Sequence, residues 1–288
     1  MEVKALKFGG LTAKRPIVQG GMGVGVSLSS LAGNVAKCGG IGTISGVHPG
    51  YREADFKENP FRANLRAIGN ELEKAKEIAN GGIIGFNFMT VMNHYEEYVK
   101  EAIAAGADFI VSGAGLPVNL AKYAAGTRAA ILPIVSSARA LKLIVKQWQR
   151  ADRLPDAVVV EGPLAGGHLG YPYGHLVDGT FDTLEDSLVD VVDYVRELEE
   201  KNGVIIPVIA GGGVRSHADM ERLMALGASG VQVGTKFVAT EECDAAPAFK
   251  QAYLRSRKED VQLIESPVGL AARAIRNSFL EKVEKQGR

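Results

Sequence analysis

Cysteine is scarce in this chain, which has only Cys38 and Cys243 among its 288 residues. The two do not form a metal-binding spacing, and their number argues against a disulfide scaffold and for a reducing compartment. Long hydrophobic runs are also missing, since no apolar stretch approaches the roughly 20 residues of a membrane span. The start of the chain, Met1 to Gly10, lacks the apolar core of a signal peptide. We therefore expect a cytoplasmic protein with no membrane partner.

The chain has no excess of charge of either sign. Lysine plus arginine and aspartate plus glutamate number 33 each. Proteins that bind nucleic acid or anionic membranes through bulk charge have a clear basic excess. The balance therefore predicts no nucleic-acid partner.

Several motifs of well-known active sites are missing. There is no H-E-x-x-H, no Cys/His cluster and no pair of carboxylates at a metal-binding spacing, so the sequence predicts no metal site. There is no G-x-S-x-G motif of a serine hydrolase. His48, His94 and His217 share no coherent spacing, and we expect them at the surface or at helix ends.

What the chain does contain is a repeated unit of apolar strand, small-residue loop and amphipathic helix, which predicts a parallel sheet. An open dinucleotide-binding sheet needs G-x-G-x-x-G after a strand, but the third glycine is replaced by Val26 counting from Gly21 and by Ser216 counting from Gly211. We therefore predict an α/β fold of the closed (β/α)8 type, a TIM barrel. Its eight strands are expected at residues 16–19, 41–45, 83–87, 109–112, 131–135, 157–161, 207–210 and 230–233.

Two regions depart from this repeat. The charged segment 46–80 is longer than one crossover needs, and we expect an extra helix there. We assign residues 1–240 to the barrel with its helical insertions. Residues 241–288 are expected to form a helical extension that packs on the barrel, with a break at 266–269. A segment this short rarely builds a core alone.

Two turns made of small residues follow the last two predicted strands. Gly211-Gly212-Gly213 follows the predicted strand 207–210, and Gly234-Thr235 follows the predicted strand 230–233. Backbone N–H groups can close on a phosphate only where no side chain intervenes, and (β/α)8 barrels often bind phosphate at these two loops. The pair predicts a phosphorylated cofactor at the ends of the last two strands.

Few polar side chains follow the other strands. Asn87 offers a donor and an acceptor, which suits the edge of a flavin ring, and a satisfied structural amide is an equal alternative. Glu161 is a partner for a ribityl chain or for the backbone, and Ser136 either binds a cofactor or caps the next helix. His168 follows Ala165-Gly166-Gly167 in the loop after Glu161, where an imidazole suits proton transfer.

Five motifs together span nearly the whole predicted barrel. They are PIVQGGMG at 16–23, GFNFM at 85–89, EGPLAGGHLG at 161–170, IAGGGV at 209–214 and VQVGTKF at 231–237. On these motifs the chain resembles the nitronate monooxygenase family (2-nitropropane dioxygenase-like). These are FMN-dependent (β/α)8 proteins related to enoyl-acyl-carrier-protein reductase II.

The resemblance implies FMN bound without a covalent bond. Asn87 then contacts the ring or the ribityl chain, and His168 matches the active-site histidine. Some relatives have a lysine near the end of the fifth strand, where this chain has Ser136-Ser137, so a contact made by that lysine is not implied here. The residues against the ring or flanking the cofactor are Gly21, Met22, Gly23, Ala165, Gly166 and Gly167. The phosphate is implied to be held by Gly211, Gly212, Gly213, Gly234 and Thr235.

The resemblance leaves the reaction open. The first hypothesis is oxidation of an alkyl nitronate by O2 to a carbonyl compound and nitrite. The second is reduction of an enoyl thioester by NAD(P)H, or another NAD(P)H:flavin oxidoreductase activity. Outside alternatives are a non-catalytic flavin-binding protein and a cofactor-free barrel enzyme. The expected partners are the small-molecule substrate and, for a homodimer, a second copy of the chain.

Overall fold

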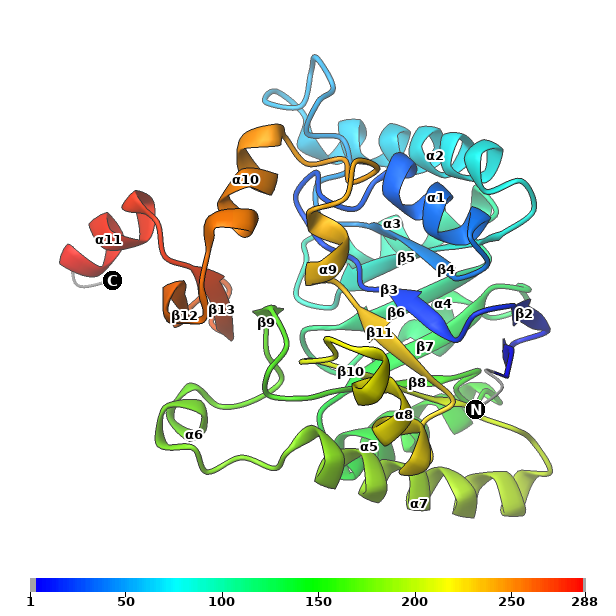
Figure 1. Ribbon diagram of the computed structural model, residues 1–288. Helices are drawn as coiled ribbons and strands as arrows, with labels where there is room; N and C mark the ends of the chain where they lie inside the picture. The colour runs from blue at the N-terminus through cyan, green and yellow to red at the C-terminus, as the bar shows by residue number, and fades with distance from the viewer. Residues whose placement is uncertain (1–3, 287–288) are drawn as a thin grey trace.

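The computed structural model describes residues 4–286, and in it eight parallel strands close into a barrel (Figure 1). Each strand pairs with the next along the chain, and β11 pairs with β3 to complete the ring. The predicted (β/α)8 class is therefore confirmed, and each predicted strand corresponds to one barrel strand. The barrel strands are β3 (Ile17–Gln19), β4 (Ile41–Ser45), β5 (Ile83–Met89), β6 (Phe109–Gly113), β7 (Ala130–Val135), β8 (Val158–Glu161), β10 (Val208–Gly211) and β11 (Gly230–Val233).

Helices surround the barrel as the amphipathic pattern requires. In α7, for example, Leu188 and Val191 are fully buried, Thr183 and Asp186 form a capping box at the start, and Gly203 ends the helix at a φ of +65°. The prediction of an extra helix in 46–80 was wrong. This segment contains one helix, α2, which is the crossover from β4 to β5. The helices are α1 (Ser29–Lys37), α2 (Pro60–Ala79), α3 (Tyr95–Ala104), α4 (Leu120–Tyr123), α5 (Ala138–Trp148), α6 (Tyr173–Asp178), α7 (Leu184–Asn202), α8 (His217–Ala225) and α9 (Thr235–Val238), with a 3-10 turn at Gln149–Ala151.

Side chains alternate between the barrel interior and the helix layer, as the two-residue period of a strand requires. In β4, Ile41 packs in the interior cluster while Ile44 packs against the helices. Interior residues near the strand starts are apolar, as Phe109 and Ile209 illustrate. Toward the carboxyl ends of the strands the interior positions become polar or small. The side chains that could bind a ligand therefore lie at that end of the barrel.

An N-terminal hairpin that the sequence analysis did not predict closes the other end. Strands β1 (Leu6–Phe8) and β2 (Leu11–Ala13) pair antiparallel. Leu6, Phe8 and Ala13 are buried in the same cluster as the interior residues of the barrel strands, and the rings of Phe8 and Phe109 meet edge to face at 6.0 Å. The amino end of the barrel is thus filled by apolar packing.

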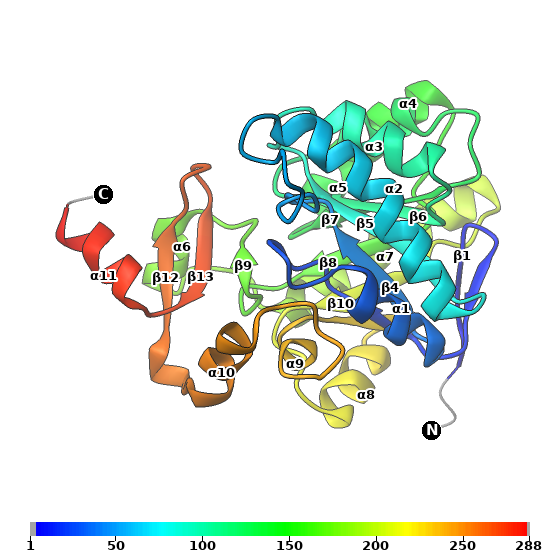
Figure 2. The same ribbon diagram turned by 90° about the horizontal axis from the view of Figure 1, so that it is seen from above.

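The C-terminal extension is only partly helical, so the prediction of a helical tail was wrong for its middle part. Helices α10 (Pro247–Arg255) and α11 (Ser278–Lys285) flank a 3-10 turn at Lys258–Asp260 and two strands. Strands β12 (Val261–Glu265) and β13 (Ala271–Ile275) form an antiparallel hairpin, and the predicted break at 266–269 is its turn. In Figures 1 and 2 the hairpin lies beside β9 (Gly167–His168), to which β13 is paired.

The extension is tied to the barrel before α10 begins. Asp244 accepts hydrogen bonds from the N–H groups of Leu28 at 2.8 Å and Leu31 at 3.1 Å, and so caps the start of α1. Cys243 is buried in a small cluster with Leu31 and Val238. Within residues 4–286, no helix combines the length and the apolar character that crossing a membrane requires.

Candidate functional site

The predicted site residues Asn87, Glu161 and Gly211 lie at the carboxyl end of the barrel, where the strand register places Ser45 and Gln232 next to them. Ser45 on β4 lies opposite Asn87 on β5. On the other side of the barrel, Gly211 lies opposite both Glu161 on β8 and Gln232 on β11. All five occupy interior-facing positions in the last residues of their strands. This is where (β/α)8 barrels carry their active sites.

The first glycine loop packs onto these strand ends. A Cβ on Gly21 would lie 2.4 Å from the Cβ of Asn87, and a Cβ on Gly23 would lie 3.0 Å from the Oγ of Ser45. Met22 contacts the turn after β11, with its sulfur 3.4 Å from where a Cβ on Gly234 would be. Only glycine allows the loop to come this close, and this brings together the predicted residues of three separate strands.

The two turns predicted to hold a phosphate both contact the loop that follows β8. Gly212 and Gly213 have φ of +96° and +88°, which favours glycine, and a Cβ on Gly212 would lie 2.9 Å from the carbonyl oxygen of Gly162. A Cβ on Gly166 would lie 4.0 Å from the Oγ1 of Thr235. Gly212 and Gly213 also line a cavity of about 290 Å³. The turns therefore converge on one loop, and the first of them opens into free space.

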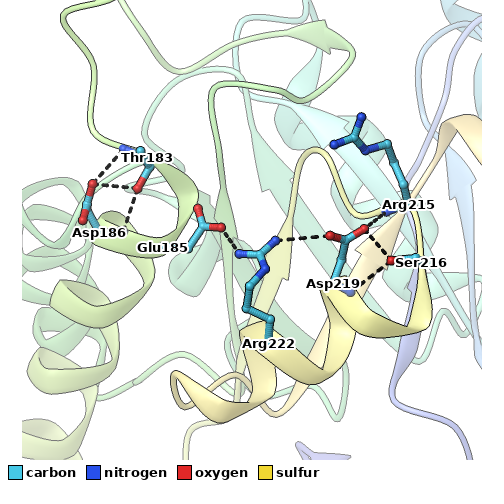
Figure 3. A network of polar contacts seen from close by, with 7 residues as sticks. All are labelled: Thr183, Glu185, Asp186, Arg215, Ser216, Asp219 and Arg222. Atoms are coloured by element: carbon cyan, nitrogen blue, oxygen red, sulfur yellow. Dashed lines mark hydrogen bonds and ion pairs between the residues drawn. The ribbon is translucent and has the colours of Figure 1, made fainter.

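A network of charged residues borders this cavity and links α7 to α8 (Figure 3). Arg222 lies between Glu185 and Asp219 and pairs with both. Asp219 accepts hydrogen bonds from the backbone N–H of Arg215 at 2.9 Å and from the hydroxyl of Ser216 at 2.9 Å. The network fixes the start of α8, and with it the backbone that follows Gly213.

A larger hollow of about 730 Å³ lies at the opposite end of the barrel. It borders the ends of α1 and α2 and is lined by Lys14, Lys37, Asn80 and His217, among others. A lysine in the last turn of a helix is stabilised by the partial negative charge of that helix end. Since this end of a barrel serves stability rather than catalysis, we place the candidate active site at the smaller cavity and the strand ends around it.

Glu161 is the most perturbed carboxyl group of the site. Burial raises its pKa to about 8, and among the described residues 4–286 no ion pair to a cation offsets this effect. Its backbone oxygen accepts a hydrogen bond from the hydroxyl of Tyr171 at 3.1 Å. The raised pKa favours the protonated carboxyl group at pH 7, which can donate a hydrogen bond. Gln232, on the other side of Gly211, can donate through its amide.

The raised pKa of Glu161 predicts a pH-dependent stability. Between the ordinary value of 4.5 and about 8, the folded state holds a proton that the unfolded state has released, so the free energy of unfolding falls as the pH rises. Glu161→Gln should remove this slope, a difference on the order of a few kcal/mol between pH 5.5 and 8. Thermal unfolding across this range measures it, with the exposed Glu200→Gln as control. Parallel curves for wild type and Glu161→Gln would contradict the assignment.

His168 lies on the two-residue strand β9, away from the barrel wall. It is half-buried, and burial lowers the pKa of its imidazole, so the ring is neutral at pH 7. In the same loop, Ala165 is buried while Gly166 and Gly167 are exposed. Ser136 donates a hydrogen bond to the carbonyl oxygen of Gly170 at 2.9 Å, which ties the end of β7 to this loop. Its hydroxyl thus orders the histidine loop.

Three polar residues of this region were missed by the sequence analysis as site residues. Gln19 bridges β3 and β4, because its amide pairs with the backbone N–H and carbonyl of Thr43. Gln232 has a buried side-chain oxygen, Oε1, without a hydrogen-bond partner in the described chain. Arg273 binds the histidine loop through its guanidinium. A polar residue near the carboxyl end of a barrel strand was the available signal for both glutamines, whereas no local signal marks Arg273.

The residues present fit a flavin mononucleotide. A buried acceptor without a partner on Gln232 and a protonated carboxyl group on Glu161 need polar partners, which a flavin ring or a ribityl chain provides. A Cβ on Gly212 would meet the backbone of Gly162 and one on Gly213 would meet Leu164, so glycine at both positions lets the turn pack against the loop after β8 and puts no side chain on the backbone N–H groups that would meet a phosphate. No group of histidine, cysteine, aspartate and glutamate residues within 4–286 is arranged to hold a metal ion.

The barrel and this site define a class of protein, namely a (β/α)8 protein whose candidate site lies at the carboxyl ends of the strands. The nitronate monooxygenase family matches residues 4–288, and the chain belongs to this family. It is 25% identical to a probable nitronate monooxygenase of Staphylococcus saprophyticus over 308 aligned positions, which cover 99% of this chain and 82% of the relative. A probable nitronate monooxygenase of Staphylococcus haemolyticus is 35% identical over 130 positions, which cover 45% of this chain and 34% of the relative.

Solved structures show the same architecture. FabK from Thermotoga maritima superposes with a TM-score of 0.74 and 26% identity, covering 95% of this chain and 75% of that one. Nitroalkane oxidase from Streptomyces ansochromogenes superposes with a TM-score of 0.68 and 22% identity, covering 94% and 79%. The second likeness shows the fold alone.

Proposed function

We propose that the protein is an FMN-dependent oxidoreductase that oxidises alkyl nitronates with O2 to a carbonyl compound and nitrite. The observation that carries this proposal is that both glycine turns contact the loop after β8, which starts at Glu161 opposite Gly211 and contains His168. Membership of the nitronate monooxygenase family supports it. When bound, FMN supplies the electron chemistry, and the protein supplies binding, orientation and proton transfer.

The chain's own residues divide this work by position. The turns at Gly212-Gly213 and Gly234-Thr235 hold the terminal phosphate through backbone N–H groups. Asn87, Glu161 and Gln232 line the barrel interior and bind the polar edge of the ring or the ribityl chain. Gly21, Met22 and Gly23 lie against the strand ends, where glycine lets the loop pack closely on Asn87 and Ser45 and offers its backbone to the flavin.

His168 acts on the substrate. A neutral imidazole can accept the α-proton of a nitroalkane, or donate its N–H to a nitronate oxygen, and the lowered pKa keeps it in this form at pH 7. The buried, apolar cluster of Ala165, Leu169, Leu176 and Ala271 beside it limits access of water to that side of the loop.

A second candidate is the NAD(P)H-dependent reduction of an enoyl thioester. The chain is 26% identical to FabK and 25% identical to the nitronate monooxygenase relative of Staphylococcus saprophyticus. Sequence identity therefore does not favour one candidate over the other. Both reactions use the same cofactor residues, so the barrel motifs do not separate them. In this alternative His168 positions the thioester or donates a proton to it.

Anaerobic reduction of the purified protein separates the two. We expect the purified protein to be yellow. Without oxygen, its flavin absorbance should fall rapidly when an alkyl nitronate is added and should persist when NADH or NADPH is added. Rapid loss with NAD(P)H and none with nitronate would assign the reductase function instead. A colourless protein that takes up no flavin from added FMN would overturn both.

A further inference from the structure

The strand that carries His168 is held by the C-terminal extension. In β9, His168 pairs with Ala272 and Gly167 with Arg273, both on β13. The backbone N–H of Leu169, the next residue, donates to the carbonyl oxygen of Ala271 at 2.8 Å. The barrel wall itself offers β9 no strand partner, since β12, β13 and β9 form a separate sheet of three strands. The position of the histidine therefore depends on a segment far away in the sequence.

Arg273 adds a side-chain link to the same loop. Its Nη1 donates hydrogen bonds to the carbonyl oxygens of Pro163 at 2.6 Å and Ala165 at 2.8 Å. These two carbonyls lie between Glu161 at the end of β8 and His168. A charged donor strengthens both bonds, so one guanidinium holds the loop at two points while its own strand pairs with Gly167.

The surroundings of Arg273 favour its hydrogen bonds to these two carbonyl oxygens. Arg273 is half-buried, and burial lowers the pKa of its guanidinium; within residues 4–286 it forms no ion pair. Its neighbours Ala271 and Ala272 are almost fully buried, with 6% and 5% of their surface exposed. Small side chains at both positions let the hairpin pack directly onto the loop, and Ala271 joins the cluster of Ala165 and Leu169.

We propose that Arg273 is a positioning residue, which acts through its two carbonyl contacts to hold His168 over the carboxyl end of the barrel. The inference rests on the function proposed above for His168. Because the hydrogen bonds of Arg273 go to backbone carbonyls of the loop, its removal should leave the cofactor in place and displace the imidazole. A displacement of about 1 Å can cost a reaction about 100-fold.

Three variants test this by turnover. Arg273→Met keeps the length and loses the donors, and we expect kcat to fall by about 10- to 100-fold with KM and flavin content little changed. Arg273→Lys restores a charged donor and should recover part of the loss. Arg276→Met is the matched control, since Arg276 lies just beyond the same strand, is exposed and bonds to Gln262 rather than to the loop. A loss of flavin in Arg273→Met, or an equal loss of kcat in Arg276→Met, would show a general structural role and overturn the inference.

A double-mutant cycle with His168→Ala shows whether the effect passes through the histidine. In the His168→Ala background, Arg273→Met should cause no further loss of kcat, whereas multiplicative losses would contradict the inference.

Hydrogen exchange of the peptide covering 162–170 gives a readout that needs no substrate. The N–H of Leu169 should exchange faster in Arg273→Met than in wild type or Arg276→Met. Equal exchange would overturn the positioning role even if the protein oxidises nitronates. Faster exchange in a protein that turns over no nitronate and no NAD(P)H would refute the proposed function and leave the loop contact standing.

Discussion

Replacing His168 with alanine should lower kcat for nitronate oxidation by about 10²- to 10⁴-fold while the protein keeps its flavin. The loss follows from removing the one imidazole of the loop after β8 that is half-buried and neutral at pH 7. The backbone of residue 168 pairs with Ala272, and alanine preserves that pairing. The loop should therefore keep its position, and the effect should appear in kcat rather than in folding.

Steady-state kinetics and the flavin content of the purified variant measure this prediction. His175→Ala is a suitable control, because His175 lies on α6 in the same connection after β8 and is exposed. We expect the control to match the wild type in both measurements. An unchanged kcat in His168→Ala would remove the role assigned to the imidazole.

Replacing Gly212 with valine should abolish tight FMN binding, with an affinity loss on the order of 100-fold or more. Two features of the structure cause this. The φ of +96° is strained for a β-branched residue, and its Cβ would lie 2.9 Å and 3.0 Å from the backbone oxygen and nitrogen of Gly162. The valine would move the turn and fill the space of the phosphate.

A control variant must separate the effect of backbone strain from the effect of the lost phosphate contact on FMN affinity. Gly203→Val provides this comparison, because Gly203 has a φ of +65°, ends α7 and has no other group within 4 Å of its Cβ position. It should lower the melting temperature without changing FMN affinity. The measurement is titration of the flavin-free protein with FMN, and a folded Gly212→Val that binds FMN as tightly as wild type would defeat the phosphate assignment.

Much of the fold followed from local signals. The eight barrel strands were predicted because each is a short apolar run between small residues, as 41–45 and 230–233 illustrate. Asn87 and Glu161 were predicted at the carboxyl ends of strands, and the structure places both on β5 and β8 there. The pairing of His168 did not follow, because a strand as short as Gly167–His168 has no periodicity of its own.

The tail shows why other predictions were wrong. The charged tail 241–288 was predicted to be helical apart from a break at 266–269, and this prediction included residues 261–265 and 271–275. They form strands because β13 completes a sheet with β9 and buries Ala271 and Ala272 against the loop. A favourable tertiary contact can override weak local preference.

By itself the sequence determined the order of strands and helices, the glycine turns after β10 and β11, and the family to which the chain belongs. These depend on local periodicity and on the backbone freedom of glycine, both of which are properties of neighbouring residues. Only the tertiary structure decided the raised pKa of Glu161, the unpartnered oxygen of Gln232 and the link from Arg273 to the histidine loop. Burial and contacts between distant segments arise when the barrel closes and the chain returns over it, and no stretch of sequence contains them alone.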